Sequence, residues 1–431
     1  MERFIYGIDF GTTNSSLSIY DREEQVIVKT ISIPSLIFFP SMISHGSEEL
    51  SCFCGKEAIE EYVSSKMSGR FIKSFKKVLS NENVKHAYIY GEKYSIPRIV
   101  SLIISDLKRK ADAIVGQEVK TVVAGRPVIF DEDKQKDNFA EGRLVAAFKI
   151  AGFERIYLQL EPIAAALTYE RIISKDETVL VADFGGGTSD FSIIKLSPNK
   201  IFNQNRKEDI VDSSGIYIGG DTFDSSFMWE VGTPHFGRGV KYESYGKKLD
   251  IPLSFFTNIC AWEKMIFFNS IKIKNTIGRY QHSSNNNPRI GNLLKLIRFN
   301  LGYSIFQSIE QTKIELSTKE STTFSFEKRS IKINEFIDQA KYNSIIEENV
   351  LKIKGRLDDF LSKNSDMAHE ISSVFVTGGT ANVGIIKRLL EDTFGPEKVR
   401  YGNLFSSVSE GLAYGIDFFE TSESFKEYSV K

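Results

Sequence analysis

The chain has 431 residues, of which 41% are hydrophobic and 26% charged, and its formal net charge at pH 7 is −1. This composition is ordinary for a soluble globular protein, and the length exceeds what one hydrophobic core usually serves, so at least two lobes are expected. A net charge so close to zero argues against an electrostatic grip on nucleic acid or on an anionic membrane, and neither is expected as a partner.

The chain begins MERFIYGIDF, which passes from one basic residue directly into an apolar, strand-like run. This start lacks the features of a secretory signal, so no signal peptide is expected. The longest apolar stretch, IPSLIFFPSMI, is interrupted by Pro34 and Pro40 and is too short to span a membrane. The three cysteines, Cys52, Cys54 and Cys260, cannot all pair. Free thiols in a reducing, cytoplasmic compartment are therefore expected in preference to a metal site.

Strand-like and helical runs alternate along the chain, which is typical of layered α/β architecture. The predicted strands are Phe4–Phe10, Ser16–Tyr20, Gln25–Thr30, Thr121–Ala124, Arg155–Leu160, Val179–Asp183, Phe191–Leu196 and Val374–Val376. The predicted helices are Arg98–Val115, Gly142–Ala151, Pro162–Ile173, Phe223–Trp229, Leu293–Leu316, Asn334–Leu361, Ile385–Glu391 and Val408–Phe419. The stretch 203–292 is rich in Gly, Asn and Ser, which predicts a loop, and the polar tail 420–431 is expected to fray.

Two stretches more than a hundred residues apart follow the same pattern. Residues 5–19 read IYGIDFGTTNSSLSI and residues 179–193 read VLVADFGGGTSDFSI. Each has an apolar run, Asp-Phe-Gly, a turn of small residues and hydroxyls, and a second alternating run. Glycines let the backbone turn sharply, and successive amide groups in such a turn form a concavity that suits phosphate oxygens. The candidate phosphate-binding residues are Gly11, Thr12, Thr13, Gly185, Gly186, Gly187 and Thr188.

The Asp that closes the first strand of each copy is a candidate metal residue. The carboxylates of Asp9 and Asp183 offer the hard oxygens that Mg²⁺ prefers, usually through its waters. The alternative is a pair of ordinary hairpins in which both residues cap turns, since Gly and Asp dominate turns for conformational reasons. Two matched copies favour two related lobes that hold a phosphate from both sides.

Several motifs resemble those of the seventy-kilodalton heat-shock (DnaK) chaperone family, within the actin and sugar-kinase superfold. GIDFGTTNSS and ADFGGGTSDF resemble its first and second phosphate motifs, and EPIAAALTYE resembles its first connecting motif. GGDTFD, IEQTKIELS, VTGGT and SEGLAYG resemble a glycine turn, the helix beside adenosine, the adenosine loop and the second connecting helix. The likeness runs in order from residue 5 to about 419, and FGRGVKYESYGKKLDIPLSFFTNICAWEKM resembles the insertion of the YegD-type proteins.

The resemblance implies an α/β, two-lobed actin-like ATPase (ribonuclease H-like) fold, with a mixed sheet flanked by helices in each lobe and an ATP cleft between them. Lobe I is expected over 1–175, with a subdomain at about 38–116 and a returning helix at 408–419. Lobe II is expected over 176–407, with a subdomain at about 231–338, followed by the tail 420–431. No substrate-binding domain that clamps peptide is expected.

The resemblance also implies catalytic roles. Lys76, in KSFKKVLS, matches the catalytic lysine, although Lys73 or Lys77 could align instead and a solvated surface lysine is the plain alternative. Glu161 would position the water or its metal. Because Pro162 follows it, Glu161 is also explained as a helix N-terminal carboxylate.

For residues of the two hairpins, the resemblance implies roles in metal binding and in hydrolysis. Asp183 and Asp9 would orient hydrated Mg²⁺, and Asp183 or Thr188 would assist the nucleophile.

The remaining implied residues surround the nucleotide base and ribose. They are Gly219, Gly220, Asp221, Glu310, Lys313, Ser317, Gly378, Gly379 and Asn382. By spacing alone, the three on the predicted helix form an exposed polar stripe. Where the family usually has an arginine that stacks on adenine, this chain has Asn382, and the family's acidic residues are absent from NLFSSVSE. Asn382 weakens the prediction of ordinary adenine binding, and the two departures together favour the alternative of a module without turnover.

The expected function is therefore slow hydrolysis of Mg-ATP, with ATP/ADP and Mg²⁺ as cofactors. A monomer is expected that acts on an unidentified protein partner or client in a nucleotide-dependent, co-chaperone-like way. The alternative is a nucleotide-binding interaction module without turnover. A small-molecule kinase or an actin-like filament protein is less favoured, although the superfold includes both.

Overall fold

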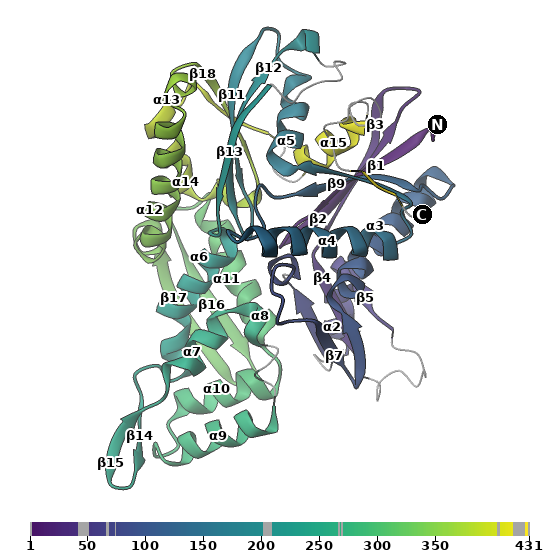
Figure 1. Ribbon diagram of the computed structural model, residues 1–431. Coiled ribbons are helices and arrows are strands. Elements are labelled where there is room, and N and C mark those ends of the chain that lie inside the picture. Colours follow the sequence, from purple (N-terminus) through teal and green to yellow (C-terminus); the bar gives the residue numbers. More distant parts are fainter. Residues whose placement is uncertain are drawn as a thin grey trace.

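The computed structural model describes residues 2–41, 51–65, 69–73, 75–200, 209–265, 268, 270–402, 406–416 and 427–429. Its two largest sheets lie in two lobes that stand side by side, each with helices packed against its sheet (Figure 1). The predicted α/β fold with two sheet-and-helix lobes is confirmed.

The first lobe is built on a mixed sheet with the strand order β20-β10-β9-β1-β2-β3. These strands are β1 (Phe4–Phe10), β2 (Asn14–Asp21), β3 (Val26–Pro34), β9 (Thr121–Arg126), β10 (Arg155–Leu160) and β20 (Glu427–Ser429). Helices α3 (Ile96–Val115) and α4 (Lys134–Ile150) share one buried core with it. The smaller elements below are β4 (Leu36–Pro40), β5 (Phe53–Cys54), α2 (Gly55–Ser64), β6 (Gly69–Lys73), the 3₁₀ turn η1 (Phe75–Val78), β7 (His86–Ile89) and β8 (Glu92–Ser95).

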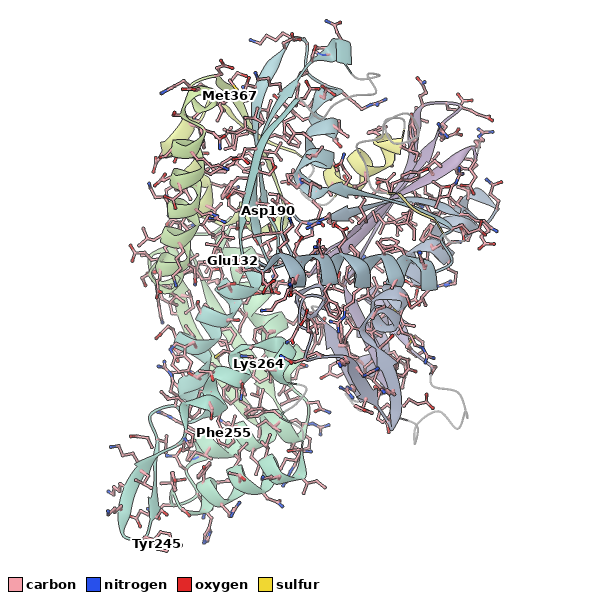
Figure 2. The ribbon with its side chains drawn as sticks, in the orientation of Figure 1. Glu132, Asp190, Tyr245, Phe255, Lys264 and Met367 are labelled. Atoms are coloured by element: carbon pink, nitrogen blue, oxygen red, sulfur yellow. The ribbon has the colours of Figure 1, made fainter. Side chains whose placement is uncertain are left out.

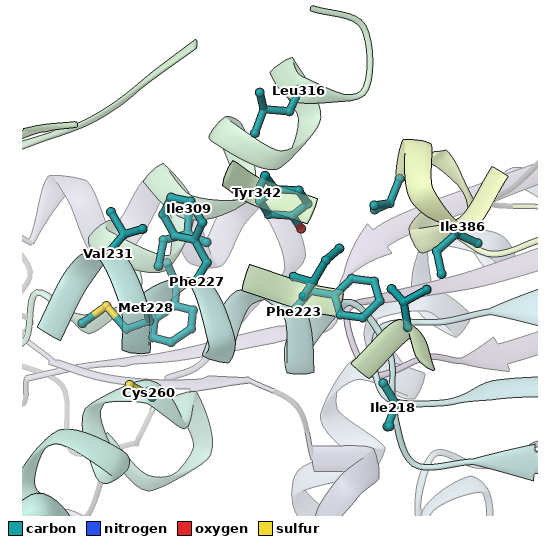
Figure 3. Close-up of a cluster of buried hydrophobic side chains, with 14 of the residues drawn as sticks. Ile218, Phe223, Phe227, Met228, Val231, Cys260, Ile309, Leu316, Tyr342 and Ile386 are labelled. Carbon is teal, nitrogen blue, oxygen red and sulfur yellow. The ribbon is translucent and has the colours of Figure 1, made fainter. Parts of the chain in front are cut away.

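The second lobe is built on a mixed sheet with the order β13-β12-β11-β18-β19. These strands are β11 (Glu177–Phe184), β12 (Ser189–Leu196), β13 (Ile210–Ile216), β18 (Ile371–Thr377) and β19 (Val399–Tyr401). The flanking elements are α6 (Gly220–Phe227), α11 (Gly302–Leu316), β16 (Ser321–Lys328), β17 (Ile331–Asp338), α12 (Gln339–Lys363), α13 (Ser365–Ala368), η7 (Gly379–Asn382) and α14 (Gly384–Phe394). Figure 3 shows part of their shared core, where Phe227, Ile309 and Tyr342 are buried.

The repeated sequence pattern forms the same supersecondary unit in both sheets. In each lobe, two antiparallel strands form a hairpin whose first strand also pairs in parallel with a later strand. Asp9 lies opposite Ser16 in the first hairpin, and Asp183 lies opposite Asp190 in the second. The two glycine turns therefore occupy equivalent places in the two lobes.

Two helices join the lobes, α5 (Glu161–Glu170) and α15 (Ser407–Tyr414). They lie side by side between the two sheets (Figure 1) and share a buried cluster with residues of β1, β9, β11 and β18. Their backbones come so close that a Cβ on Gly411 would lie 1.7 Å from the Ala164 carbonyl oxygen. Thr168 also donates a hydrogen bond of 2.7 Å to the Ser407 carbonyl oxygen.

The prediction of a loop over 203–292 is wrong for residues 209–292, the part of it that the structure describes. Besides β13 and α6, this part contains η4 (Met228–Gly232), η5 (Thr233–Phe236), β14 (Lys241–Ser244), β15 (Lys247–Asp250), α7 (Leu253–Cys260), α8 (Trp262–Met265), α9 (Ile271–His282) and the start of α10 (Pro288–Arg298). The polar residues cap short helices instead of forming a long loop. Ser270 accepts a hydrogen bond from the Ile273 amide, and Asn287 accepts one from the Arg289 amide.

The helix predicted over Gly142–Ala151 begins earlier in the structure, at Lys134 in α4. Two further predicted helices also have the wrong extent. The single helix over 293–316 is two helices, α10 and α11, because Asn300 adopts a left-handed φ of 51° between them. The helix over 334–361 begins only after Asp338, whose side chain accepts a hydrogen bond from the Lys341 amide. The residues before it form β17, whose buried Ile331, Ile333 and Ile337 follow the two-residue period of a strand.

The predictions near the chain end are only partly covered by the described residues. The helix expected at 408–419 is α15, and residues 417–419 lie outside them. Within the tail expected to fray, residues 427–429 form β20, antiparallel to β10.

No helix in the described ranges is long and apolar enough to cross a membrane. The three cysteines, all within those ranges, are unpaired.

The α5–α15 crossing leads to the first prediction. Gly411→Ala forces the two backbones apart, so we expect the free energy of unfolding to fall by about 2 kcal/mol or more, as for other overpacked cores. Gly142→Ala is the matched control, because its new Cβ meets nothing within 4 Å in α4. The control is expected to gain about 0.5–1 kcal/mol from helix propensity. Urea unfolding of both variants measures the difference. Equal free energies of unfolding would contradict the close approach of α5 and α15 at Gly411.

Candidate functional site

A cavity of about 470 Å³ opens between the two glycine hairpins. Every site residue predicted from the sequence lines it except Gly219. The predicted residues in its wall are Asp9, Gly11, Thr12, Thr13, Lys76, Glu161, Asp183, Gly185, Gly186, Gly187, Thr188, Gly220, Asp221, Glu310, Lys313, Ser317, Gly378, Gly379 and Asn382.

The two hairpin turns approach each other across the cavity. A Cβ on Gly186 would lie 2.1 Å from the Thr13 hydroxyl oxygen, a distance that real side chains do not adopt. Each turn is braced by its own lobe, since the Gly185 amide donates to the Thr188 carbonyl (3.0 Å) and Ser35 donates to the Gly11 carbonyl (2.7 Å). The close approach therefore requires glycine, as the sequence suggested.

A third glycine turn, at the start of α6, supports the second hairpin from behind. The Gly220 amide donates to the Gly185 carbonyl (3.1 Å), which also accepts a hydrogen bond from the Thr380 hydroxyl (2.8 Å). A Cβ on Gly219 would lie 2.7 Å from the carbonyl oxygens of Gly185 and Gly186. Gly219 thus packs against the hairpin and does not face the cavity.

A buried ion pair lies at the end of the cavity nearest the lobe I hairpin. Nζ of Lys76, on η1, lies 2.6 Å from Oε1 of Glu161, and the two side chains are only 11% and 7% exposed. Burial alone lowers the pKa of Lys76, but Glu161, Asp9 and Asp183 together raise it above its usual value, so the amine stays charged. Lys73 lines a different cavity, and the Lys77 side chain lies outside the described part.

The charge of Lys76 acts on three aspartates of the two hairpins, Asp9, Asp183 and Asp190, of which Asp9 and Asp183 line the cavity. Burial, followed by the charge of Glu161, raises the pKa of Asp9 and raises that of Asp183 to about 6. Burial and then the charge of Asp183 raise the pKa of Asp190 to about 8. The Asp183 carboxylate accepts a hydrogen bond of 2.8 Å from Thr377. Among the described residues, one buried carboxylate oxygen of Asp9 and one of Asp190 have no hydrogen-bond partner.

This surplus of buried negative charge fits a bound cation. In the described part of the chain no three Asp, Glu, His or Cys side chains come close enough to ligate a metal directly. A hydrated Mg²⁺, held through its waters by unpartnered carboxylate oxygens, is compatible with that geometry.

Sequence reasoning missed Asp190 and Asp224. Asp190 lies opposite Asp183 in the β11–β12 register, so the hairpin pattern itself contained the signal. Asp224 lines the cavity four residues into α6 and pairs with Lys313, its Oδ1 lying 2.7 Å from the ammonium. Burial raises the pKa of Asp224, and the nearby Lys313 opposes that effect. Nothing in the local sequence indicated that pair, because its members are far apart in the chain.

The far end of the cavity is formed by α11 and the turn after β18. Glu310, Lys313 and Ser317 face the cavity from one side of α11, although the Ser317 hydroxyl donates to the Ile314 carbonyl in its own helix (2.7 Å). Across from them, Asn382 ends η7, where its side-chain amide donates to the Gly379 carbonyl (3.4 Å).

Gly378, just before η7, has a left-handed φ of 82°, and a Cβ there would lie 2.2 Å from the Phe184 carbonyl oxygen. The wall of the cavity thus requires glycine at this turn too.

The arrangement brings backbone amides and hydroxyls from two turns together in the cavity, whose wall also contains Lys76 and the carboxylates of Asp9, Glu161 and Asp183. Such a site can hold a polyphosphate with a hydrated divalent cation and stabilise charge that develops during phosphoryl transfer.

A comparison with protein families agrees with this geometry. A family model described as Hsp70 protein matches residues 5–236 and 303–426. The two ranges cover most of the 431 residues and include all residues that line the cavity.

The raised pKa of Asp190 predicts a pH effect. Without nucleotide or divalent cation, the folded state keeps a proton on Asp190 to about pH 8, whereas the unfolded chain loses it near pH 4. The folded state therefore binds more protons in this window, and this group's contribution to stability falls as pH rises. We therefore expect the free energy of unfolding of Asp190→Asn to gain about 1 kcal/mol or more over that of wild type as the pH rises from 5 to 8.

Urea unfolding in EDTA at both pH values measures this gain. Asp366→Asn, at an exposed position on α13, is the control. The same pH trend in both variants would show that Asp190 ionises normally.

Proposed function

The chain belongs to the Hsp70 family, and on that premise we propose that it binds Mg-ATP between its two lobes and hydrolyses it slowly. The family implies a nucleotide-binding, chaperone-type ATPase. The observation that best supports the proposal for this chain is the pair of hairpin turns that face each other across the cavity, with Gly186 against Thr13. Neither turn alone would enclose a phosphate.

The proposed lobe I comprises residues 1–175, with its subdomain at about 38–116 and the returning helix at 408–419. Lobe II comprises 176–407, with its subdomain at about 231–338. The two main sheets, one in each proposed lobe, support this division.

The phosphates of the nucleotide would lie between the turns, where amide and hydroxyl groups of both hairpins can donate to them. Asp9 and Asp183 would orient Mg²⁺ through its waters, with Asp190 adding negative charge close by. When bound, Mg²⁺ would neutralise charge on the β- and γ-phosphates. The three glycines 185–187 would allow the backbone to approach these oxygens without a Cβ in the way.

In the proposed hydrolysis, a water oxygen bonds to the γ-phosphorus while the bond to the β–γ bridging oxygen breaks, and ADP keeps that oxygen. Lys76, held in place by Glu161, would neutralise charge developing on the γ-phosphate and place the water. Asp183 or Thr188 would assist the attacking water, whose proton would pass to the Asp183 carboxylate. With a pKa of about 6, Asp183 is mostly ionised at pH 7 and able to accept it.

Ribose and adenine would lie against Glu310, Lys313 and Ser317 on one side and the turn at Gly378, Gly379 and Asn382 on the other. The Lys313–Asp224 pair would fix the position of the ammonium. Since Asn382 offers a short amide in place of a planar cation, weak adenine binding is expected.

At the level of the whole molecule, we expect a YegD-type member of the family that is monomeric and cytoplasmic. Three unpaired cysteines support a reducing compartment. Closure of the lobes on nucleotide would present a surface whose shape depends on ATP or ADP, which an unidentified partner or client protein would read.

Asn382 also supports a second candidate function, a nucleotide-binding interaction module without turnover. A small-molecule kinase or a filament-forming relative remains less favoured, because the likeness lies with the chaperone family.

Calorimetry and single-turnover hydrolysis test the proposal together. We expect Mg-ADP and Mg-ATP to bind the wild type, and Lys76→Ala and Asp183→Asn to slow hydrolysis about 100-fold or more because each removes a group that acts on the γ-phosphate. Lys85→Ala, at an exposed lysine, is the control.

The outcomes separate the candidates. If nucleotide binds but the wild type hydrolyses it no faster than buffer does, the interaction module is favoured. If no nucleotide binds at millimolar concentration, both functions are excluded. A kinase would turn over faster when its acceptor is added, and a filament protein would sediment with ATP.

Asn382→Arg tests the adenine side of the cavity. A guanidinium there can stack on the base, so we expect the affinity for Mg-ADP to rise about two- to fivefold. The affinity for tripolyphosphate, which has no base, should stay the same. A parallel rise for both ligands would indicate a general charge effect and not adenine stacking.

A further inference from the structure

A second cavity, of about 820 Å³, lies between the lower parts of the two lobes. Lobe I contributes residues of α2, β6, η1, β7 and the turn after it, and lobe II contributes residues of α8, α10 and the start of α11. Its size is that of a site for a small organic molecule.

The cavity has an aromatic wall made by both lobes. The ring of Tyr303 lies 4.5 Å from that of Phe71 and 5.6 Å from that of Tyr62, measured between centroids. Tyr62 also donates a hydrogen bond of 2.7 Å across the gap to the Asn300 carbonyl. Tyr62 is only 1% exposed, so it supports this wall from behind, and the partly buried Phe71 and Tyr303 form its apolar surface.

The charged side chains around the cavity have one sign. Arg70, Lys73 and Lys264 line it, and none of the described residues in its lining is Asp or Glu. Lys264 lies on the side of lobe II that faces lobe I (Figure 2). His86 also lines the cavity, and desolvation followed by the positive charges of Lys93, Lys85 and Arg143 lowers its pKa, so its neutral form is favoured.

Arg70 is the strongest indication of a missing partner. Within the described part of the chain, its buried Nε has no hydrogen-bond partner. Burial lowers the pKa of its guanidinium, and of the neighbouring groups only Tyr90 acts against that effect. A buried donor on a charged group that lacks an acceptor is costly. Because Arg70 lines the cavity, an anion bound there would offset the cost of burying its guanidinium charge.

The lobe I side of the cavity is rigidly held. The Arg143 guanidinium donates to the carbonyls of Val78, Leu79, Asn81 and Val84, and three of these residues line the cavity. The segment between η1 and β7 is thus fixed by the guanidinium of Arg143, whose two terminal nitrogens both donate hydrogen bonds to it. Arg70 differs, because its buried Nε has no partner among the described residues.

We infer that this second cavity binds a small organic monoanion with an apolar body, of the aromatic carboxylate class. The apolar body would lie against Phe71 and Tyr303, and the carboxylate would accept hydrogen bonds from the guanidinium of Arg70, with Lys264 adding positive charge to the lining. This inference does not depend on nucleotide binding, because the residues that it uses are not those of the first cavity.

The test uses naphthalene-2-carboxylate and its neutral isostere, naphthalene-2-carboxamide, in calorimetry with the full chain. The carboxylate is expected to bind at least about tenfold more tightly than the amide, since a charge-assisted hydrogen bond distinguishes them. Arg70→Gln should weaken carboxylate binding about tenfold or more and leave amide binding unchanged. Arg289→Gln, an exposed arginine on α10 outside the cavity, is the matched control.

A second readout locates the ligand. With methyl-labelled methionine, the Met265 signal, assigned through Met265→Leu, should shift on addition of the carboxylate and still shift in the presence of saturating Mg-ADP. If circular dichroism shows that Arg70→Gln does not fold, Lys264→Gln replaces it as the variant expected to weaken carboxylate binding, and the comparison of carboxylate with carboxamide is kept. No saturable binding below about 1 mM, equal binding of acid and amide, or an unmoved Met265 signal would each overturn the inference.

Discussion

The geometry of the first cavity depends on the buried ion pair between Lys76 and Glu161. Its members come from a 3₁₀ turn and from the first residue of a helix 85 positions further on, and both are nearly inaccessible. A buried charge is stable only with its partner, so each residue fixes the other's place. Further carboxylates lie around this pair, and the single positive charge of Lys76 cannot neutralise them all. A polyphosphate that brings a divalent cation would offset this excess, so the charges of the site favour such a ligand.

Backbone proximity is the second requirement, and glycine supplies it. The turns meet at Gly186, the supporting turn fits at Gly219, and the joining helices cross at Gly411. Each contact links elements that are distant in sequence, so a Cβ at any one of them would move a whole hairpin or helix. Gly186 lets the two hairpins approach each other across the cavity, Gly219 lets the third turn pack on the second hairpin, and Gly411 lets the two joining helices cross.

Much of this could be predicted from the sequence, for a physical reason. Phosphate turns are local: strand, Asp, glycines and hydroxyls stand together in the chain, and so the hairpins and the alternating α/β pattern were recognisable. Tertiary pairs are not local. Asp224 meets Lys313 across 89 positions, which no local pattern records. The residues 209–292 were misread because the same Asn and Ser side chains that favour turns also cap short helices.

The two cavities are lined by different parts of the chain. All residues of the first lie inside the ranges matched by the Hsp70 family model. The second takes Lys264, Met265, Leu296, Ile297, Asn300 and Gly302 from the unmatched stretch between those ranges. The part of the chain that departs from the family model thus forms one wall of a cationic, aromatic cavity, and lobe I supplies the other wall with an unsatisfied arginine. A property specific to this chain is more reasonably sought in the second cavity than in the nucleotide site that its family shares.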